Sequence, residues 1–185
     1  VSEYCGESVD AGNGDGSTEP RFSCNVNITQ RQEAYGLINA LCSVMRVMPF
    51  YSAGGISISQ DAPKSASYIF TNANVIEGSF IYTGSSLKTR HTVINVSYFD
   101  MVTQEVDVET VEADAATQAK YGIVIKNIKA FATTSRNQAR RLGRWFLYNE
   151  QNSGETCSFV TTAAAGVLVR PGDVIEISDR LKAGV

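Results

Sequence analysis

This sequence lacks most of the features by which catalytic and metal-binding proteins are recognised. It has a single histidine, His91, and none of its four cysteines stands in a C-x-x-C pair. The motifs of phosphate-binding loops, zinc proteases and serine hydrolases are also missing from the printed sequence. We therefore expect no catalytic residues, no metal and no cofactor.

Long apolar runs and an excess of positive charge are missing as well. No run approaches the ~20 apolar residues that a membrane helix requires, which predicts no stable membrane insertion. The formal net charge of -3 provides no basic field that would attract DNA or anionic lipid. What remains is an ordinary globular composition of 185 residues, 43% of them hydrophobic, which is enough to bury a core.

The first 20 residues are rich in Gly, Asp and Ser, which predicts a linker over 1–20. A calcium-loop interpretation fails because Ala11 and Phe22 stand where carboxylates are required. The chain begins at Val1 without an initiator Met and stops soon after a strand-like run. We therefore expect a fragment of a longer protein.

Apolar spacing predicts an α+β fold with mostly antiparallel strands and two main amphipathic helices. A first lobe, 21–87, would hold a strand with Phe22, Cys24, Val26 and Ile28 on one face. A helix over 30–48 would follow, begun by a Thr29–Gln32 capping box and ended by Pro49, and then several short strands.

A second lobe, 88–185, is predicted to be rich in strands. Ile94, Val96 and Tyr98 alternate on one face of its first strand. Further strands are expected in VDVETV, YGIVIKNIKAFA, ETCSFVTT, GVLV and VIEIS, with a short helix near 113–120, a longer helix over 135–150 and a turn at Arg170–Asp173.

The helix over 135–150 carries the most distinctive chemistry. Ser135 and Gln138 form a second capping box, and the apolar positions include Gly143, which predicts close approach to another backbone. Four arginines gather on the outer face: Arg136, Arg140, Arg141 and Arg144. A solvated face, an interface with acidic residues of a partner chain, and direct DNA binding all remain open.

Other polar residues have simpler interpretations. His91 is expected to be a partly exposed strand residue, and Glu105, Asp107 and Glu109 the solvent face of a strand, since they alternate with valines. The cysteines Cys24, Cys42 and Cys157 fall at apolar-periodic positions, which favours buried free thiols.

Long runs of this sequence resemble one family. AFATTSRNQARRLGRWFLYNE, ETCSFV and VRPGDVIEISD, together with upstream runs such as PRFSCNVNITQRQEAYGLINALCSVMRVMPFY, are similar to the protein J family of lambda-type phage tail tips. The resemblance covers nearly all of residues 20–180, whereas the Gly-rich start matches less well.

The resemblance implies a structural role in the hub of a phage tail. It implies small barrel-like tail-hub lobes, a homotrimer in the intact protein, and contacts with other tail tip and tail tube proteins. DNA would pass nearby without specific binding, and the host receptor would be contacted by regions outside this chain. The implied location is the virion tail tip, assembled in the bacterial host cytoplasm. The resemblance also favours a subunit interface formed by Arg136, Arg140, Arg141 and Arg144. A receptor-binding module and a cell-wall hydrolase are the alternatives.

Overall fold

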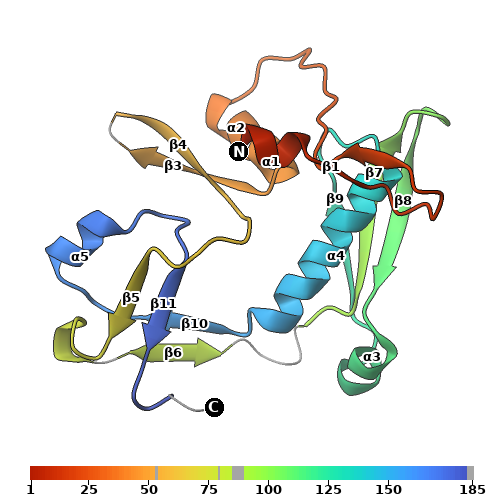
Figure 1. Cartoon of the computed structure of the whole chain (residues 1–185). Helices are drawn as coiled ribbons and strands as arrows, with labels where there is room; N and C mark the ends of the chain where they lie inside the picture. Colours follow the sequence, from red (N-terminus) through yellow and green to blue (C-terminus); the bar gives the residue numbers. More distant parts are fainter. Residues whose placement is uncertain (53, 79, 85–89, 183–185) are drawn as a thin grey trace. The chain divides into compact units, whose positions relative to one another are not determined.

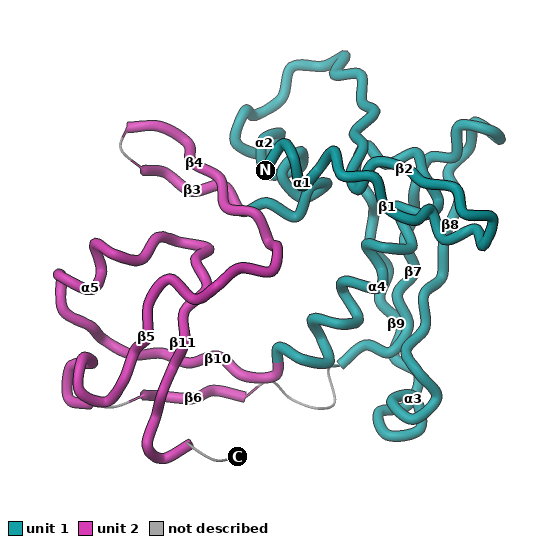
Figure 2. The backbone as a smooth tube through the Cα atoms, in the orientation of Figure 1, with its two compact units in different colours: residues 1–47, 86–153 teal, residues 48–85, 154–185 magenta. Residues whose placement is uncertain are grey.

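The computed structural model describes residues 1–52, 54–78, 80–84 and 90–182, and it divides into two compact units. Unit 1 comprises residues 1–47 and 86–153, and unit 2 comprises residues 48–85 and 154–185 (Figure 2). Each unit is therefore built from two separate segments. The predicted lobes 21–87 and 88–185 were continuous instead, because spacing along a sequence does not reveal which distant strands pair.

Unit 1 contains every described helix longer than six residues, and Figure 1 labels the elements of both units. Its elements are α1 (Ser2–Gly6), β1 (Ser8–Asp10), β2 (Thr18–Pro20), α2 (Ala34–Val44), β7 (Val93–Asp100), β8 (Glu105–Glu112), α3 (Ala115–Tyr121), β9 (Ile125–Lys129) and α4 (Arg136–Asn152). Unit 2 contains β3 (Val47–Ser52, of which Val47 belongs to unit 1), β4 (Gly55–Gln60), β5 (Tyr68–Thr71), the 3-10 turn η1 (Ile76–Gly78), β6 (Ile81–Gly84), β10 (Glu155–Ser158), α5 (Ala163–Leu168) and β11 (Ile175–Ser178).

The core of unit 1 lies between α4 and a three-stranded sheet. The strand order is β8-β7-β9, with β8 antiparallel and β9 parallel to β7. Ile94, Val96 and Tyr98 are buried on the face that α4 covers, together with Ala139 and Leu147 of the helix. The predicted alternation of this strand is therefore confirmed.

Gly143 allows α4 to lie close to that sheet. A Cβ atom at this position would stand 2.7 Å from Val111 Cγ2 and 3.1 Å from Val96 Cγ2. The predicted close approach is real, but it is to valine side chains of β7 and β8 and not to a backbone. A helical glycine costs about 1 kcal/mol relative to alanine, which the tighter packing offsets.

Unit 2 is made of two-stranded sheets: β3 with β4, β5 with β11 in parallel, and β6 with β10 in antiparallel orientation. Its buried cluster is small, consisting of Phe70, Val75 and Ala165 with partly buried neighbours around them. The predicted turn after α5 is present, with Gly172 at φ 83° and the Asp173 N–H donating to the Arg170 carbonyl at 3.0 Å.

Two predictions for residues 22–48 are wrong. Residues 22–28 form no strand, because the Asn25 N–H donates to the Ala132 carbonyl at 2.8 Å and the segment lies against the start of α4. The helix runs from Ala34 to Val44, with Glu33 at the N-cap, so the Thr29–Gln32 capping box does not begin it. It ends before Arg46, whose φ of 52° is incompatible with a helix, and Pro49 lies in β3.

The prediction of a strand at GVLV is wrong too, because three alanines carry this region into α5. The mixed α+β class with mostly antiparallel strands is confirmed. Among the described residues the strands form open sheets and no closed barrel. Within the same residues, none of the helices has the length and apolar character needed to cross a membrane.

Candidate functional site

Helix α4 presents a row of outward positions spaced four residues apart. The buried residues of the helix are Gln138, Ala139, Gly143 and Leu147, which face the sheet and the N-terminal segment. One turn after another, the same helix exposes Arg136, Arg140, Arg144 and Tyr148. Of the four predicted interface arginines, two contact Glu109 on β8, namely Arg136 and Arg140. Arg141 contacts the N-terminal segment, and among the described residues Arg144 contacts neither.

Glu109 of β8 holds the first two arginines. The Arg136 Nε–H donates to Glu109 Oε2 at 2.7 Å, and Arg140 Nε lies 3.9 Å from the other carboxylate oxygen. The Glu109 side chain is only 11% exposed, so the prediction that it lies on a solvent face is wrong. The hydrogen bond and the nearby negative charge raise the pKa of Arg136 above its ordinary value.

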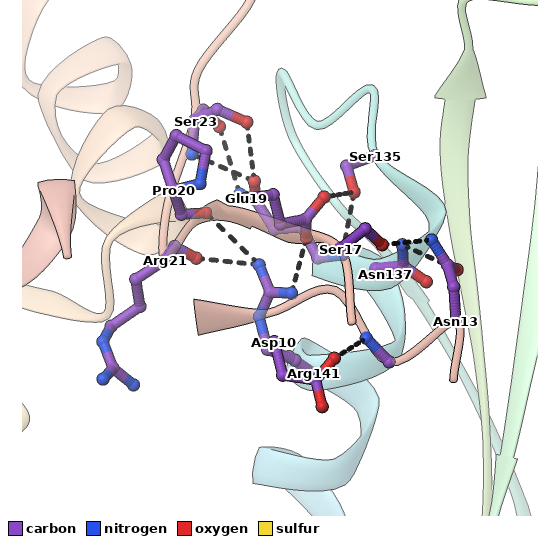
Figure 3. Close-up of polar contacts among 12 residues, drawn as sticks. Asp10, Asn13, Ser17, Glu19, Pro20, Arg21, Ser23, Ser135, Asn137 and Arg141 are labelled. Carbon is purple, nitrogen blue, oxygen red and sulfur yellow. Dashed lines mark hydrogen bonds and ion pairs between the residues drawn. The ribbon is translucent and has the colours of Figure 1, made fainter. Parts of the chain in front are cut away.

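Arg141 holds the N-terminal segment (Figure 3). Its guanidinium forms an ion pair with Glu19 and donates to the Arg21 carbonyl at 3.0 Å. Glu19 also accepts a hydrogen bond from the Ser135 hydroxyl at 2.8 Å, and Ser135 in turn caps α4 by accepting from the Gln138 N–H. One carboxylate therefore joins the helix start to β2.

Gln138 extends this attachment. In a complete capping box its side chain would return to the N-cap N–H, but here it accepts from the Ser23 N–H at 3.0 Å and donates to the Ser23 carbonyl at 3.1 Å. Asn25 adds a hydrogen bond of 2.7 Å to the Thr134 hydroxyl. The first 20 residues, predicted to be a linker, thus contain α1, β1 and β2, and their end is anchored on α4.

Arg144 differs from the other three arginines. It is exposed, and within the described ranges no carboxylate lies at ion-pair distance from it. Tyr148, one turn further along, is exposed as well. Arg144 and Tyr148 are therefore exposed without a carboxylate partner in the described ranges, whereas the exposed Arg136 and Arg140 share Glu109.

Glu150 ties the far end of α4 to the sheet. It accepts from the His91 backbone N–H at 2.8 Å, contacts His91 Nδ1 at 2.8 Å, and accepts from Lys126 Nζ at 3.1 Å. Burial raises the pKa of the Glu150 carboxyl, but these hydrogen bonds outweigh burial and lower it below its ordinary value. Of the hydrogen bonds to the His91 ring among the described residues, all go to Glu150, which is the arrangement of a structural anchor.

A family model described as a putative phage tail protein matches residues 33–185 of the chain. The chain belongs to this family of phage tail proteins. Two relatives are both named tip attachment protein J, one from Escherichia phage SECphi27 at 39% identity and one from Escherichia phage SECphi4 at 27%. Each match covers 180 residues and 97% of this chain but only 15% and 16% of the relatives, respectively, so the chain spans a small part of the proteins it matches. The resemblance to lambda-type tail tip proteins is confirmed.

In this phage tail protein the polar residues described above serve mainly to join secondary-structure elements.

The cysteines are free, but Cys24 is exposed and Cys157 half-buried, so of the three thiols predicted to be buried only Cys42 is. A cavity of about 330 Å³ in unit 2 has a lining that is largely apolar, formed by η1, α5 and nearby residues. Glu19 and Gln138 are anchors that local sequence does not reveal, because nothing near them in the chain indicates which distant groups they contact.

Proposed function

We propose that this chain is a structural segment of a phage tail tip that takes part in host attachment. The observation that carries the proposal is its similarity, across 97% of its length, to two proteins named tip attachment protein J. In the intact protein the segment would associate as a homotrimer with other tail tip and tail tube proteins. DNA would pass nearby without specific contacts, and receptor contact would be made by other regions.

The chemistry of the described residues supports a structural rather than an enzymatic role. The best-connected ionisable groups, Glu19, Glu109 and Glu150, are each held by two or more partners that join secondary-structure elements. Such groups are positioned to stabilise a fold. The interface proposed on α4 comprises Arg136, Arg140, Arg141 and Arg144, of which Arg136, Arg140 and Arg144 are exposed and Arg141 holds the N-terminal segment.

Labelling of intact phage particles tests this proposal. An epitope inserted at the exposed Gly14, or an antibody raised against the 185-residue chain, should place gold particles at the tail tip in electron micrographs. The particle would be assembled in the host cytoplasm, so capsid-free tails from lysates should carry the label too. Label on the capsid or tail shaft, or on no particle, would contradict the proposal.

Adsorption and lysis assays separate the two alternatives. Isolated chain that competes with phage for host cells would identify a receptor-binding module. A cell-wall hydrolase would release peptidoglycan fragments and lose that activity in a His91→Ala variant. For a structural segment we expect neither competition nor release.

A further inference from the structure

The hairpin that joins β7 and β8 projects from the sheet of unit 1 (Figure 1). Strand β9 pairs with β7 only as far as Ser97, whereas β7 and β8 remain paired out to Asp100 and Glu105. The last pairs therefore extend past the third strand. Phe99 lies opposite Val106 there, on the sheet face away from α4, and the two are 42% and 68% exposed.

The turn at the tip of this hairpin contains apolar residues although it is exposed to water. Turns normally use Gly, Asn, Asp or Ser, but here the turn contains Met101 and Val102, and Val102 is 90% exposed. The tip is nevertheless ordered by a hydrogen bond of 2.7 Å from the Val102 N–H to Asp100 Oδ1. The tip therefore presents two exposed apolar side chains on a turn ordered by this hydrogen bond.

The negative charge of the hairpin limits the kind of molecule that can bind it. The stretch from Phe99 to Glu112 contains no Lys, Arg or His, while Asp100 and Glu105 flank the tip. Membrane-surface segments combine apolar residues with Lys and Arg, so an anionic lipid surface would repel this hairpin. An apolar contact bordered by cationic side chains would complement it.

The chain itself offers such a contact on α4. Arg140 stands two turns and Arg144 one turn before Tyr148, so two guanidinium groups and one aromatic ring share one exposed row. Arg144 has no carboxylate at ion-pair distance within the described ranges, and Tyr148 is 66% exposed. The row therefore presents a guanidinium group that is unpaired among the described residues, that of Arg144, and an exposed aromatic ring, that of Tyr148.

Within the described ranges, neither Asp100 nor Glu105 of the hairpin lies at ion-pair distance from Arg140 or Arg144 of the same chain. Side chains of Val96 and Val111 face α4, as their contact distances to Gly143 show, and strand alternation places Phe99 and Val106 on the other face. The hairpin and the α4 row of one chain are therefore not paired with each other among the residues that the structure describes, and a second copy could supply the contact. Because the hairpin and the row are different surfaces, a single contact of this kind between two copies is heterologous.

We propose that the β7–β8 hairpin of one copy docks on the Arg140–Arg144–Tyr148 row of a second copy of this chain. Met101 and Val102 pack against Tyr148, and Asp100 and Glu105 pair with Arg140 and Arg144. The proposal rests on the subunit interface of the proposed function and names the partner surface. Repeated contacts of this type generate a ring if the rotation closes.

Complementary variants of the 185-residue chain give a direct test by sedimentation equilibrium. Val102→Asp destroys the hairpin surface and leaves the α4 row, whereas Arg144→Glu does the reverse. We expect the unmodified chain to self-associate at 50 mM salt, and each variant alone to associate at least about tenfold more weakly. A mixture of the two variants should restore one good contact per pair and form 1:1 dimers.

Control variants at comparable exposed positions are Ile123→Asp and Arg31→Glu, which should associate like the unmodified chain. The inference is overturned if the chain stays monomeric at 300 µM, if the mixture forms no dimers, or if the controls weaken association equally. Val102-dependent sedimentation with phosphatidylglycerol vesicles would also overturn it and assign the hairpin to a membrane. Gold label at the tail tip with a monomeric chain would leave the proposed function standing without this contact.

Discussion

Unit 1 and unit 2 bury apolar surface very differently. Unit 1 has a continuous core between α4 and the β8-β7-β9 sheet, with Ile94 and Val96 fully buried. Unit 2 has only a small buried cluster around Phe70 and three two-stranded sheets. Although unit 2 is the shorter, it exposes as many large apolar side chains as unit 1 among the described residues.

The difference indicates how each unit is stabilised. A helix on a three-stranded sheet can be stable alone, whereas a two-stranded sheet is marginal without a further layer. We expect unit 1 to be the independently stable body and unit 2 to depend more on neighbours in an assembly. Four variants test whether the two units differ in this way.

The largest effect is expected for Ile94→Ala. Ile94 has 0% exposure in the unit 1 core, so the substitution leaves a cavity and should cost about 2–5 kcal/mol of unfolding free energy. Urea denaturation followed by the fluorescence of Trp145, the only tryptophan, reports on unit 1. Ile69→Ala in unit 2, where Ile69 is half exposed, should shift the transition much less, and equal shifts would remove the distinction between the units.

Gly143→Ala should also destabilise unit 1, by about 1–3 kcal/mol. The new Cβ would stand 2.7 Å from a methyl of Val111, and a β-branched side chain in a strand has little freedom to move away. Gly36→Ala in α2 is the matched control, since its Cβ would meet only Glu33 Oε2 at 3.7 Å. The control should be neutral or stabilising by up to about 1 kcal/mol; a stabilised Gly143→Ala variant would show that α4 can move off the sheet.

Glu150→Gln tests the anchor at the far end of α4. At pH 7 it should lower the unfolding free energy by about 1–3 kcal/mol, because the hydrogen bonds from His91 and Lys126 lose their charged acceptor. The folded pKa of Glu150 is lowered from 4.5, so its contribution is present above that pH and is lost as pH falls through the folded pKa. The gap between parent and variant should therefore narrow as urea titrations move from pH 7 towards pH 3.

The control for Glu150 is Glu155→Gln, which removes a more exposed carboxylate paired with Lys182 in unit 2. Surface pairs contribute roughly 0–1 kcal/mol, so its effect should be small. If Glu150→Gln and its parent differ by the same amount at every pH, the carboxylate charge plays no part in the anchor.

Ser135→Ala should have the smallest effect, about 1 kcal/mol, because it removes the N-cap of α4 and one hydrogen bond to Glu19. Thr162→Ala is its counterpart in unit 2, since Thr162 is the N-cap of α5 but makes no side-chain cap hydrogen bond. Thermal unfolding should show a lower midpoint for the first variant and little change for the second.

Predictions from sequence succeeded where local periodicity coincided with burial. Alternation at Ile94, Val96 and Tyr98 identified the central strand, and Ser135 marked the start of α4 within one residue. They failed at 22–28 and at 30–33, where an apolar alternation and a capping motif had no strand partner and no packing surface to support them. Local signals of this kind are weak without tertiary contacts.

The candidate site shows the same division. Helical spacing alone predicts that one face of a helix over 135–150 carries four arginines, because the period of the helix fixes which residues share a face. Chain folding brings Glu109 and Glu19 to three of these arginines and leaves Arg144 without a carboxylate partner in the described ranges. Those carboxylates lie 27 or more positions away along the chain, and no local pattern encodes a contact that chain folding alone brings about.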